Sequence, residues 1–535
     1  MAGGAWFVYR LGLRLLDADF ALTLAFAYLL YPALLFVALF EFHPVALAVF
    51  FLLGALEAFE RQSLRPFLIF LCLALACQED VSLVVAALGI YGLLRRRPLA
   101  WSLVPLGLGA GLFSLSALFL MPRWNPGTVN FWLLYSHLGQ GFSEILGFVL
   151  THPLRTFSMM VEGTARKVFI INLLVPLGFL PLLDPKSFLL TFPSFFEQLL
   201  SRRGFQNMLY FHYTALLIPF LFFAALHGLR VLLRMPFIAV KRTLLQILLI
   251  SLALLSTVTT GSFGTLQGTL RETRSGLLDA KRQQLVQSIP ADASVVTTFE
   301  FLPRLTNRLH LYSLHHICIG RYTLSRKTYD IPQGIDRLLV DFNDPLTISF
   351  IDGSENADKR LAQFLEGWRI REAFGDLVCF ERGESASLIR TVADFSASQN
   401  IHVQIEDAFT LLGFTGFSGR GKEEGILPLT FFWECLKPTP KQYGLLFEFL
   451  DGKKRVIARN YHSIGYRIYP TFRWKKGERL EEVYSLVLPK AAQGESSYEL
   501  RISYVDERAQ RRVPITSQGV EGEDISFGMI EVTGG

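Results

Sequence analysis

The placement of charged residues within the first 261 positions is the feature that most restricts how this chain can fold, because these residues fall at alternating ends of long apolar runs. One set of ends is basic and holds Arg61, Arg65, Arg95, Arg96, Arg97, Arg230, Arg234, Lys241 and Arg242. The other set holds Glu41, His43, Glu79, Asp80, His212 and Tyr213. A charge at the centre of a bilayer costs about 2.5–3.5 kcal/mol on insertion scales. The pattern therefore predicts a polytopic α-helical membrane domain with its arginine loops in the cytoplasm.

The apolar runs predict the individual helices. They cover 20–40, 45–59, 65–78, 81–94, 99–121, 166–184, 188–201, 211–229 and 243–261. Five of them approach the 20 or so residues that a span needs: 20–40, 99–121, 166–184, 211–229 and 243–261. The shorter runs are expected to cross as well, because arginines flank them. This topology puts the loop 122–165, with an interfacial helix over 141–160, on the outer face, together with everything after residue 261.

Composition excludes several classes of protein. The 535 residues are 51% hydrophobic, with a mean hydropathy of +0.36, more apolar than is usual for a soluble protein. The net charge of +6 follows from the arginine loops, so no nucleic-acid partner is expected. The five cysteines are dispersed, without a CxxC pair, and predict neither a zinc site nor a disulfide framework.

Residues after 261 have the composition of soluble domains. Helix patterns at 275–289 and 302–308 alternate with strand patterns at 293–299 and 338–342, which predicts a small α/β domain over 270–385. From about residue 400, short strands alternate with turns, as in 443–450, Asp451-Gly452 and 455–459. That spacing is typical of an antiparallel β-sandwich over 400–535. Both domains are expected outside the cytoplasm, after a membrane domain over 1–261.

The acidic ends of the runs 20–40 and 65–78 form a candidate site. Both runs point outward, so packing would bring Glu41 and His43 close to Glu79 and Asp80. Carboxylates at a membrane surface can bind a divalent metal with phosphate ligands, or act as a general base. The pair Arg202-Arg203 could hold a lipid phosphate. The alternative is that charges simply end helices where water begins, with Asp80 capping the helix that follows.

Three other patterns have structural explanations. Asp17-Ala18-Asp19 has the spacing of a metal-binding DxD motif, but on the predicted cytoplasmic side an N-terminal helix cap is favoured. Gly107, Gly109 and Gly111 predict a helix-packing face. Five aromatics of the β domain could form a sugar platform, but core positions are favoured: Trp433, Tyr443, Tyr466, Tyr469 and Trp474.

Several short motifs together resemble a known family. Phe42-His43-Pro44, then Gln78-Glu79-Asp80, then His212-Tyr213-Thr214-Ala215 resemble the bacterial predicted membrane proteins of DUF2079. The segments 289–295 and 302–308 resemble the α/β part of that family, and the resemblance covers about residues 15–385. The family is similar to GT-C membrane glycosyltransferases, which take a sugar from a polyprenyl-phosphate donor at the outer membrane face.

This resemblance implies sugar transfer to a glycan or lipid acceptor at the bacterial inner membrane. The catalytic residues would be Glu79, Asp80 and His43, and the donor phosphate would meet Arg202, Arg203, His212 and Tyr213. A divalent metal, Mg²⁺ or Mn²⁺, is a candidate cofactor. The alternative is a non-catalytic membrane protein, either a lipid-linked-sugar transporter or an envelope scaffold whose β domain binds glycan.

The chain departs from the family pattern in two places. Gln78 stands where the family has lysine, which weakens any phosphate contact at that position. The resemblance also implies that the first helix and the first outer loop, where GT-C enzymes carry their key acidic residue, lack a counterpart in this sequence. The chain resembles the family from the tail of the second helix, near 5–16.

Overall fold

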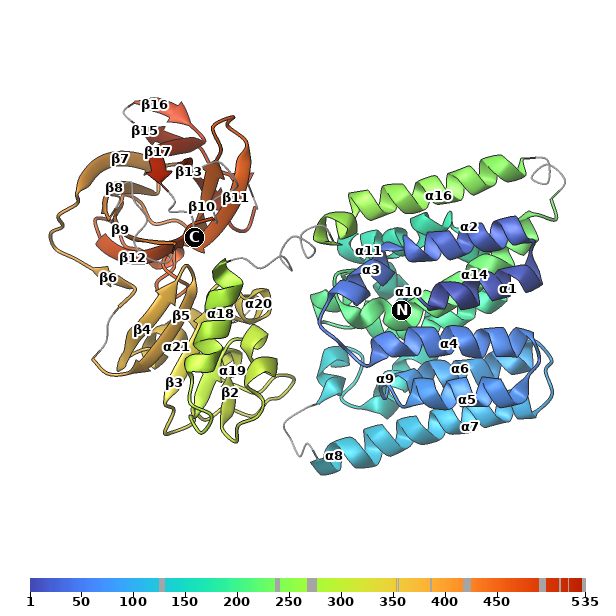
Figure 1. Ribbon diagram of the computed structural model, residues 1–535. Helices are drawn as coiled ribbons and strands as arrows, with labels where there is room; N and C mark the ends of the chain where they lie inside the picture. The colour runs from blue at the N-terminus through green and yellow to red at the C-terminus, as the bar shows by residue number, and fades with distance from the viewer. Residues whose placement is uncertain are drawn as a thin grey trace. The chain divides into compact units, whose positions relative to one another are not determined.

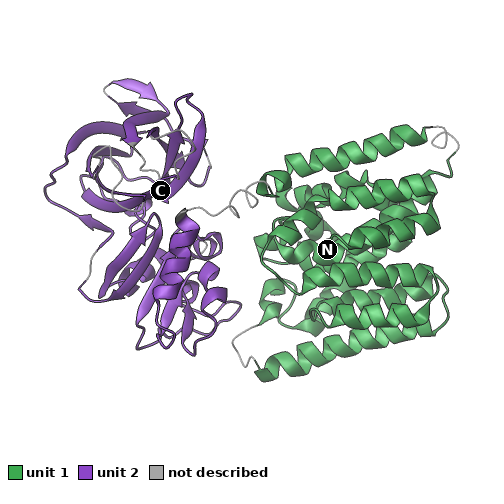
Figure 2. Ribbon diagram, in the orientation of Figure 1, with its two compact units in different colours: residues 1–272 green, residues 273–535 purple. Residues whose placement is uncertain are grey.

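The computed structural model describes residues 1–535 except 125–129, 236–240, 267–276, 353, 355, 385–386, 417–424, 490–496, 510, 518 and 532–535. The chain forms two compact units, residues 1–272 and 273–535 (Figures 1 and 2). The first unit is helical and the second is built mainly of β-sheet, as the sequence predicts. The finer domain boundaries at 261, 270, 385 and 400 stay predictions.

The helices of the first unit follow most of the predicted runs. They are α1 (Gly4–Leu15), α2 (Ala18–Leu29), α3 (Pro32–Leu39), α4 (Val45–Glu60), α5 (Leu64–Leu75), α6 (Val81–Leu94), α7 (Ala100–Ser114), η1 (Leu115–Leu120), α8 (Met121–Trp124), η2 (Phe131–Tyr135), α9 (Phe142–Thr151), α10 (Pro153–Val161), α11 (Thr164–Leu174), η3 (Val175–Leu177), η4 (Leu180–Leu183), α12 (Pro185–Phe188), η5 (Leu189–Thr191), α13 (Phe192–Leu199), η6 (Gly204–Asn207), η7 (His212–Leu216), α14 (Leu217–Leu232) and α16 (Arg242–Thr259).

Three of the described helices are long and apolar enough to cross a membrane: Ala100–Trp124, His212–Leu232 and Arg242–Thr259. The first and third lie at opposite edges of the unit and expose most of their apolar side chains, whereas His212–Leu232 is buried among the other helices (Figure 1). Apolar side chains facing outward at the edges are what a lipid environment requires.

Two of the predicted long runs are not continuous helices. The run 20–40 is a pair, α2 and α3, bent by 42°, because Tyr31 is extended and Pro32 starts a new helix. The prediction of one helix over 166–184 is wrong. Helix α11 ends at Leu174, and two left-handed residues, Gly178 and Phe179, separate the short 3-10 turns that follow it.

Charged side chains gather at one end of the first unit. Arg242 pairs with Asp17, Arg14 Nε lies 3.3 Å from Glu57 Oε1, and Arg97 Nη2 lies 3.9 Å from Glu60 Oε2. These pairs join the C-terminal ends of α1, α4 and α6 to the starts of α2 and α16. Asp17 Oδ1 also accepts from the backbone N–H of Phe20 at 3.1 Å, so the capping interpretation of the DxD motif is confirmed.

Helix α16 runs parallel to α2 from this basic end. Gln246 Nε2 donates to Thr23 Oγ1 at 3.4 Å, and Thr257 Oγ1 donates to the backbone oxygen of Leu30 at 2.6 Å. Helix α16 therefore ends at the same level as α3, at the end of the unit that also holds His43. The predicted sorting of charges to two opposite ends is confirmed, while the side of the membrane that each end faces stays a prediction.

Small residues hold α6 against α7. A Cβ atom on Gly109 would lie 2.4 Å from the backbone oxygen of Ser82, and one on Gly89 would lie 2.5 Å from that of Ser102. No atom lies within 4 Å of such a Cβ on Gly107 or Gly111. The predicted packing face is therefore right for Gly109 alone, and this close contact fixes the start of α6.

The second unit begins with an α/β region. Its helices are α18 (Leu277–Ser288), η8 (Phe299–Phe301), η9 (Pro303–Leu305), α19 (Leu314–Ile319), α20 (Pro345–Asp352) and α21 (Ala357–Phe364), and its strands are β1 (Val295–Thr297), β2 (Leu311–Ser313), β3 (Arg337–Asp341), β4 (Trp368–Phe374) and β5 (Leu377–Arg382). The sheet order is β2-β1-β3-β5-β4. Strands β1, β2 and β3 are parallel and β4 and β5 antiparallel, which confirms the predicted α/β class.

Two antiparallel sheets complete the second unit. One has the order β16-β15-β7-β8-β9-β12-β6, and the other has β11-β10-β13-β14 with β17 also on β13. Their strands are β6 (Ile389–Thr391), β7 (Gln399–Ile405), β8 (Phe409–Thr415), β9 (Ile426–Cys435), β10 (Tyr443–Leu450), β11 (Val456–Ser463), β12 (Arg479–Val487), β13 (Ser497–Asp506), β14 (Arg511–Arg512), β15 (Ile515–Ser517), β16 (Val520–Gly522) and β17 (Asp524–Glu531).

Aromatic side chains pack between these two sheets. The rings of Trp433 and Tyr504 lie 6.4 Å apart, and those of Phe409 and Tyr443 lie 5.1 Å apart. Trp433, Tyr443, Tyr466 and Trp474 are all buried. The core interpretation is confirmed for these four, whereas Tyr469 is only half-buried. The sheets face each other as in a β-sandwich.

A buried ionic network joins the α/β sheet to the sandwich. His462 Nδ1 lies 2.7 Å from Asp376 Oδ1, and His462 Nε2 lies 3.1 Å from Glu482 Oε1. Trp433 Nε1 donates to the other oxygen of Glu482 at 2.9 Å. Burial alone lowers the pKa of His462, but Asp376 and then Glu482 outweigh it and raise that pKa to about 10. The imidazolium form is therefore the one that this network stabilises.

Replacing His462 should make the second unit less stable and less sensitive to alkali. Because the folded-state pKa lies above the ordinary 6.5, the stabilisation is complete below pH 6.5 and is lost as pH rises through about 10. We expect His462→Gln to lower the free energy of unfolding near neutral pH by about 3 kcal/mol, since it leaves two buried carboxylates without their cation.

Urea unfolding of the full chain, followed by tryptophan fluorescence from pH 6 to 11, measures this effect. The difference between wild type and His462→Gln should shrink as pH rises from about 6.5 to about 10 and stay small above that. A difference that stays constant across that range would contradict the assignment of a charged His462.

Candidate functional site

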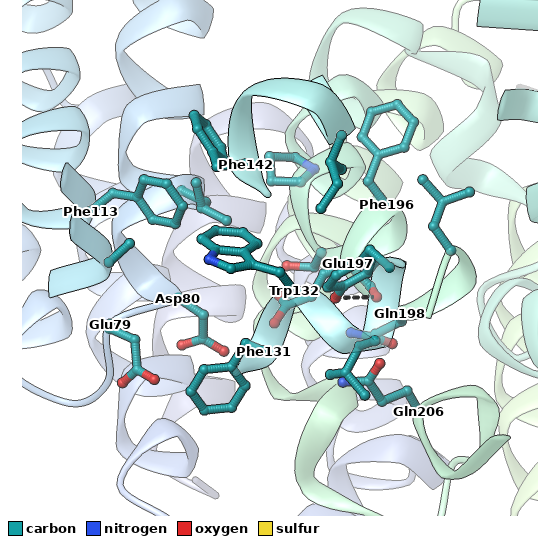
Figure 3. Close-up of a pocket in the computed structure, with 18 of the residues that line it drawn as sticks. Glu79, Asp80, Phe113, Phe131, Trp132, Phe142, Phe196, Glu197, Gln198 and Gln206 are labelled. Atoms are coloured by element: carbon teal, nitrogen blue, oxygen red, sulfur yellow. Dashed lines mark hydrogen bonds between the residues drawn. The ribbon is translucent and has the colours of Figure 1, made fainter. Parts of the chain in front are cut away.

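A cavity of about 790 Å³ opens in the first unit, at the end away from the ion pairs of Arg14, Arg97 and Arg242 (Figure 3). Its walls come from the turn before α6, the end of α7, and from η2, α9, α13 and η7. Ligand cavities commonly measure about 300–1,000 Å³. The size suits a small organic group together with part of a lipid chain.

Two predicted carboxylates, Glu79 and Asp80, lie on one wall (Figure 3). Gln78 Nε2 donates to Asp80 Oδ2 at 3.1 Å, and Asp80 Oδ1 is buried with no partner among the described residues. Asp80 stands at the N-cap of α6 without a side-chain capping bond, so capping does not account for its carboxylate. Burial, and then the charge of Glu79, raise the pKa of Asp80 above its ordinary value. A raised pKa suits the Asp80 carboxylate to accept a proton.

A third carboxylate, Glu197 on α13, also lines the cavity and was not predicted (Figure 3). It lies close enough to Asp80 and Glu79 for the three charges to interact. Its backbone oxygen accepts from Tyr135 Oη at 2.8 Å, which anchors α13 beside η2. The signal in the sequence was a single acid within the apolar run 188–201, where an ionisable residue is a functional candidate by default.

The predicted histidines meet at the edge of the cavity. The rings of His43 and His212 stack with centroids 3.6 Å apart and an interplanar angle of 20°. His212 and Tyr213 line the cavity, whereas His43 does not line it and reaches it only through its contact with His212. The structure therefore brings the end of α3 to the start of η7, which the topology predicted. Glu41 is exposed and does not line the cavity.

Only one of the two predicted arginines reaches the cavity. Arg203 lines the cavity, but Arg202 is exposed and its Nη1 donates to Ser136 Oγ at 3.3 Å. Arg203 is therefore the cation that faces the same space as the carboxylates. Neighbouring residues at an extended position point to different sides, so the sequence could not distinguish this pair.

Aromatic side chains form the apolar part of the cavity: Phe113, Phe131, Trp132, Phe142 and Phe196 (Figure 3). Phe142 belongs to α9, which with α10 replaces the single interfacial helix predicted over 141–160. Pro153 starts the second helix. Leu150 and Leu154 beside this break are 70% and 85% exposed. The segment thus lines the cavity on one face and exposes apolar side chains on the other, as an interfacial helix does.

The described residues do not form a metal centre by geometry: no three His, Cys, Asp or Glu side chains converge there as ligands. A divalent cofactor stays a prediction. What the cavity does combine is a carboxylate with a raised pKa, a guanidinium and an aromatic wall. Those groups can together accept a proton, hold a phosphate and cover an apolar chain.

A helical unit with lipid-facing apolar helices and a polar cavity at one end defines a membrane protein. Comparison with known families agrees, because the chain belongs to DUF2079, described as predicted membrane proteins, whose model matches residues 1–365. The match continues from the first unit to the end of α21. No curated protein and no solved structure matches the chain.

Cysteine labelling tests on which side of the membrane the cavity opens. In a chain with Cys72 and Cys77 replaced by serine, Glu79→Cys should react with a membrane-impermeant maleimide added to intact cells. Arg61→Cys, an exposed position at the other end, should react only after the cells are permeabilised. The opposite pattern would place the cavity on the cytoplasmic side and contradict the topology.

Proposed function

We propose that the protein is a membrane glycosyltransferase that transfers a sugar from a polyprenyl-phosphate donor to a glycan or lipid acceptor at the outer face of the inner membrane. The observation that carries the proposal is the single cavity in which Asp80, Arg203 and the aromatic wall meet. A polyprenyl-phosphate sugar has an apolar chain, an anionic phosphate and a hydroxyl-rich headgroup, and each of these finds a matching part of the cavity.

In the proposed reaction, the acceptor hydroxyl attacks the anomeric carbon of the sugar. A carbon–oxygen bond forms there while the bond from that carbon to the phosphate oxygen breaks, and the phosphate leaves with the electron pair. Asp80 takes the proton of the acceptor hydroxyl, and its raised pKa suits it to hold that proton. Glu79 supplies the negative charge that, together with burial, raises the affinity of Asp80 for a proton.

Arg203 and His212 would bind the donor. A guanidinium pairs with phosphate oxygens through two parallel hydrogen bonds, and its charge offsets that of the leaving phosphate. His212 Nδ1 is buried without a partner in the described part of the chain, and the stacked ring of His43 fixes the plane of His212. His43 is therefore a positioning residue, and Arg202 contributes no contact to this step.

The direction of α16 supports a role for the second unit. Because α16 ends at the cavity end of the first unit, the chain that follows starts on the side where the acceptor would be bound. The α/β sheet and the sandwich would recognise the acceptor or a partner protein outside the cytoplasm.

Substituting Asp80 tests this mechanism. Membranes containing the full chain are incubated with decaprenyl-phosphate hexose, and release of decaprenyl phosphate is followed by mass spectrometry. We expect Asp80→Asn to slow the release at least about 100-fold at normal expression, the usual effect of losing a general base. Asp19→Asn is the matched control, since Asp19 is an exposed acid at the opposite end.

Equal release by Asp80→Asn and wild type would contradict the assigned base. No release by wild-type membranes with any of a panel of hexoses would contradict the enzyme and favour the transporter or scaffold.

A further inference from the structure

Beyond the carboxylates and Arg203, the cavity has a third kind of surface formed by neutral polar side chains. Ser194, Gln198 and Gln206 line it and are only 1%, 3% and 6% exposed. Ser194 Oγ, Gln198 Oε1 and Gln206 Oε1 are buried without a hydrogen-bond partner among the residues that the structure describes. A buried polar atom left without a partner costs about 1–3 kcal/mol, so three of them beside one cavity indicate a ligand that supplies the missing bonds.

The chemistry of these atoms identifies the kind of group that they would bind. Gln198 Nε2 donates to the backbone oxygen of Tyr213 at 2.7 Å, which fixes this amide with its oxygen as the free atom. The amide oxygens of Gln198 and Gln206 only accept. Phosphate and carboxylate oxygens are also acceptors and would be repelled. Hydroxyl groups supply the donors without carrying a charge.

The position of Gln206 next to Arg203 connects this surface to the donor phosphate. Gln206 N–H donates to the backbone oxygen of Arg203 at 3.1 Å, and the two residues are separated by one turn of 3-10 helix. Both side chains line the cavity. Figure 3 shows Gln198 and Gln206 away from Glu79, on the side of the cavity nearer α13.

We infer that Ser194, Gln198 and Gln206 form a subsite for the neutral, hydroxyl-rich sugar of the donor, directly beside the phosphate held by Arg203. This inference rests on the proposed function and deepens it. It assigns the sugar to the surface formed by these amides and leaves the side of Glu79 and Asp80 to the acceptor. It also predicts selection for uncharged sugars, because an acidic sugar would bring acceptors to the same oxygens.

Binding measurements on the full chain in lipid nanodiscs test the subsite. The two probes are decaprenyl phosphate and decaprenyl-phosphate hexose, measured by microscale thermophoresis. Wild type should bind the hexose-bearing lipid at least about tenfold more tightly than the bare lipid. Gln206→Met should remove about tenfold of that preference, the effect of losing one well-made buried hydrogen bond, and should leave affinity for the bare lipid within about twofold.

Two further variants separate this role from a loss of folding. Ser194→Ala removes a second free oxygen with little change in volume and should reduce the preference about threefold, in the range of a single neutral hydrogen bond. Asn207→Met is the matched control. Asn207 follows Gln206 and also has an unpartnered amide oxygen among the described residues, but it does not line the cavity, so its replacement should change nothing.

Each outcome decides between the two proposals. An unchanged hexose preference in Gln206→Met and Ser194→Ala would overturn the subsite. Equal binding of both lipids by wild type would also overturn the subsite while leaving a phosphate site at Arg203. Binding of neither lipid would overturn the proposed function, and the subsite with it.

Discussion

The exclusion of charge from a lipid bilayer is the constraint on which the structure of the first unit depends. Apolar helices can cross or enter the bilayer only if their ionisable residues are moved to the ends. Arg14, Arg97 and Arg242 meet acids at one end. Asp80, Glu197 and His212 collect around a cavity at the other. A rule that governs insertion thus also concentrates reactive groups in one place.

The side chains collected at the cavity differ in chemistry, and different kinds lie on different sides of it. Glu79 and Asp80 line one side, Glu197 and the amides of Gln198 and Gln206 lie away from Glu79, and aromatic rings cover much of the rest (Figure 3). Arg203 lines the same cavity. Close packing of α6 on α7 through Gly89 and Gly109 fixes the side that holds Glu79 and Asp80. Helices α9 and α13 supply much of the remaining wall.

Much of this organisation could be predicted from the sequence because it depends on local patterns. Charge alternation placed His43, Asp80 and His212 at one end, and the Asp451-Gly452 turn predicted the hairpin of β10 and β11. The prediction of one helix over 166–184 was wrong because a hydropathy pattern does not reveal the left-handed turn at Gly178 and Phe179.

Glu197 and the amides were missed because their importance comes from tertiary contacts across α13, η2 and η6. The same holds for the buried His462 network, whose three ionisable members come from β11, β12 and the turn between β4 and β5. Sequence spacing alone gave no reason to connect them.

The central claim is that segments far apart in the sequence meet at one end of the membrane unit, and a disulfide cross-link measures this most directly. His43 and His212 have ring centroids 3.6 Å apart. In a chain with Cys72 and Cys77 replaced by serine, His43→Cys combined with His212→Cys should form an intramolecular disulfide under mild oxidation, detected by mass spectrometry of tryptic peptides. Failure of this pair to cross-link in the folded protein would contradict the shared site.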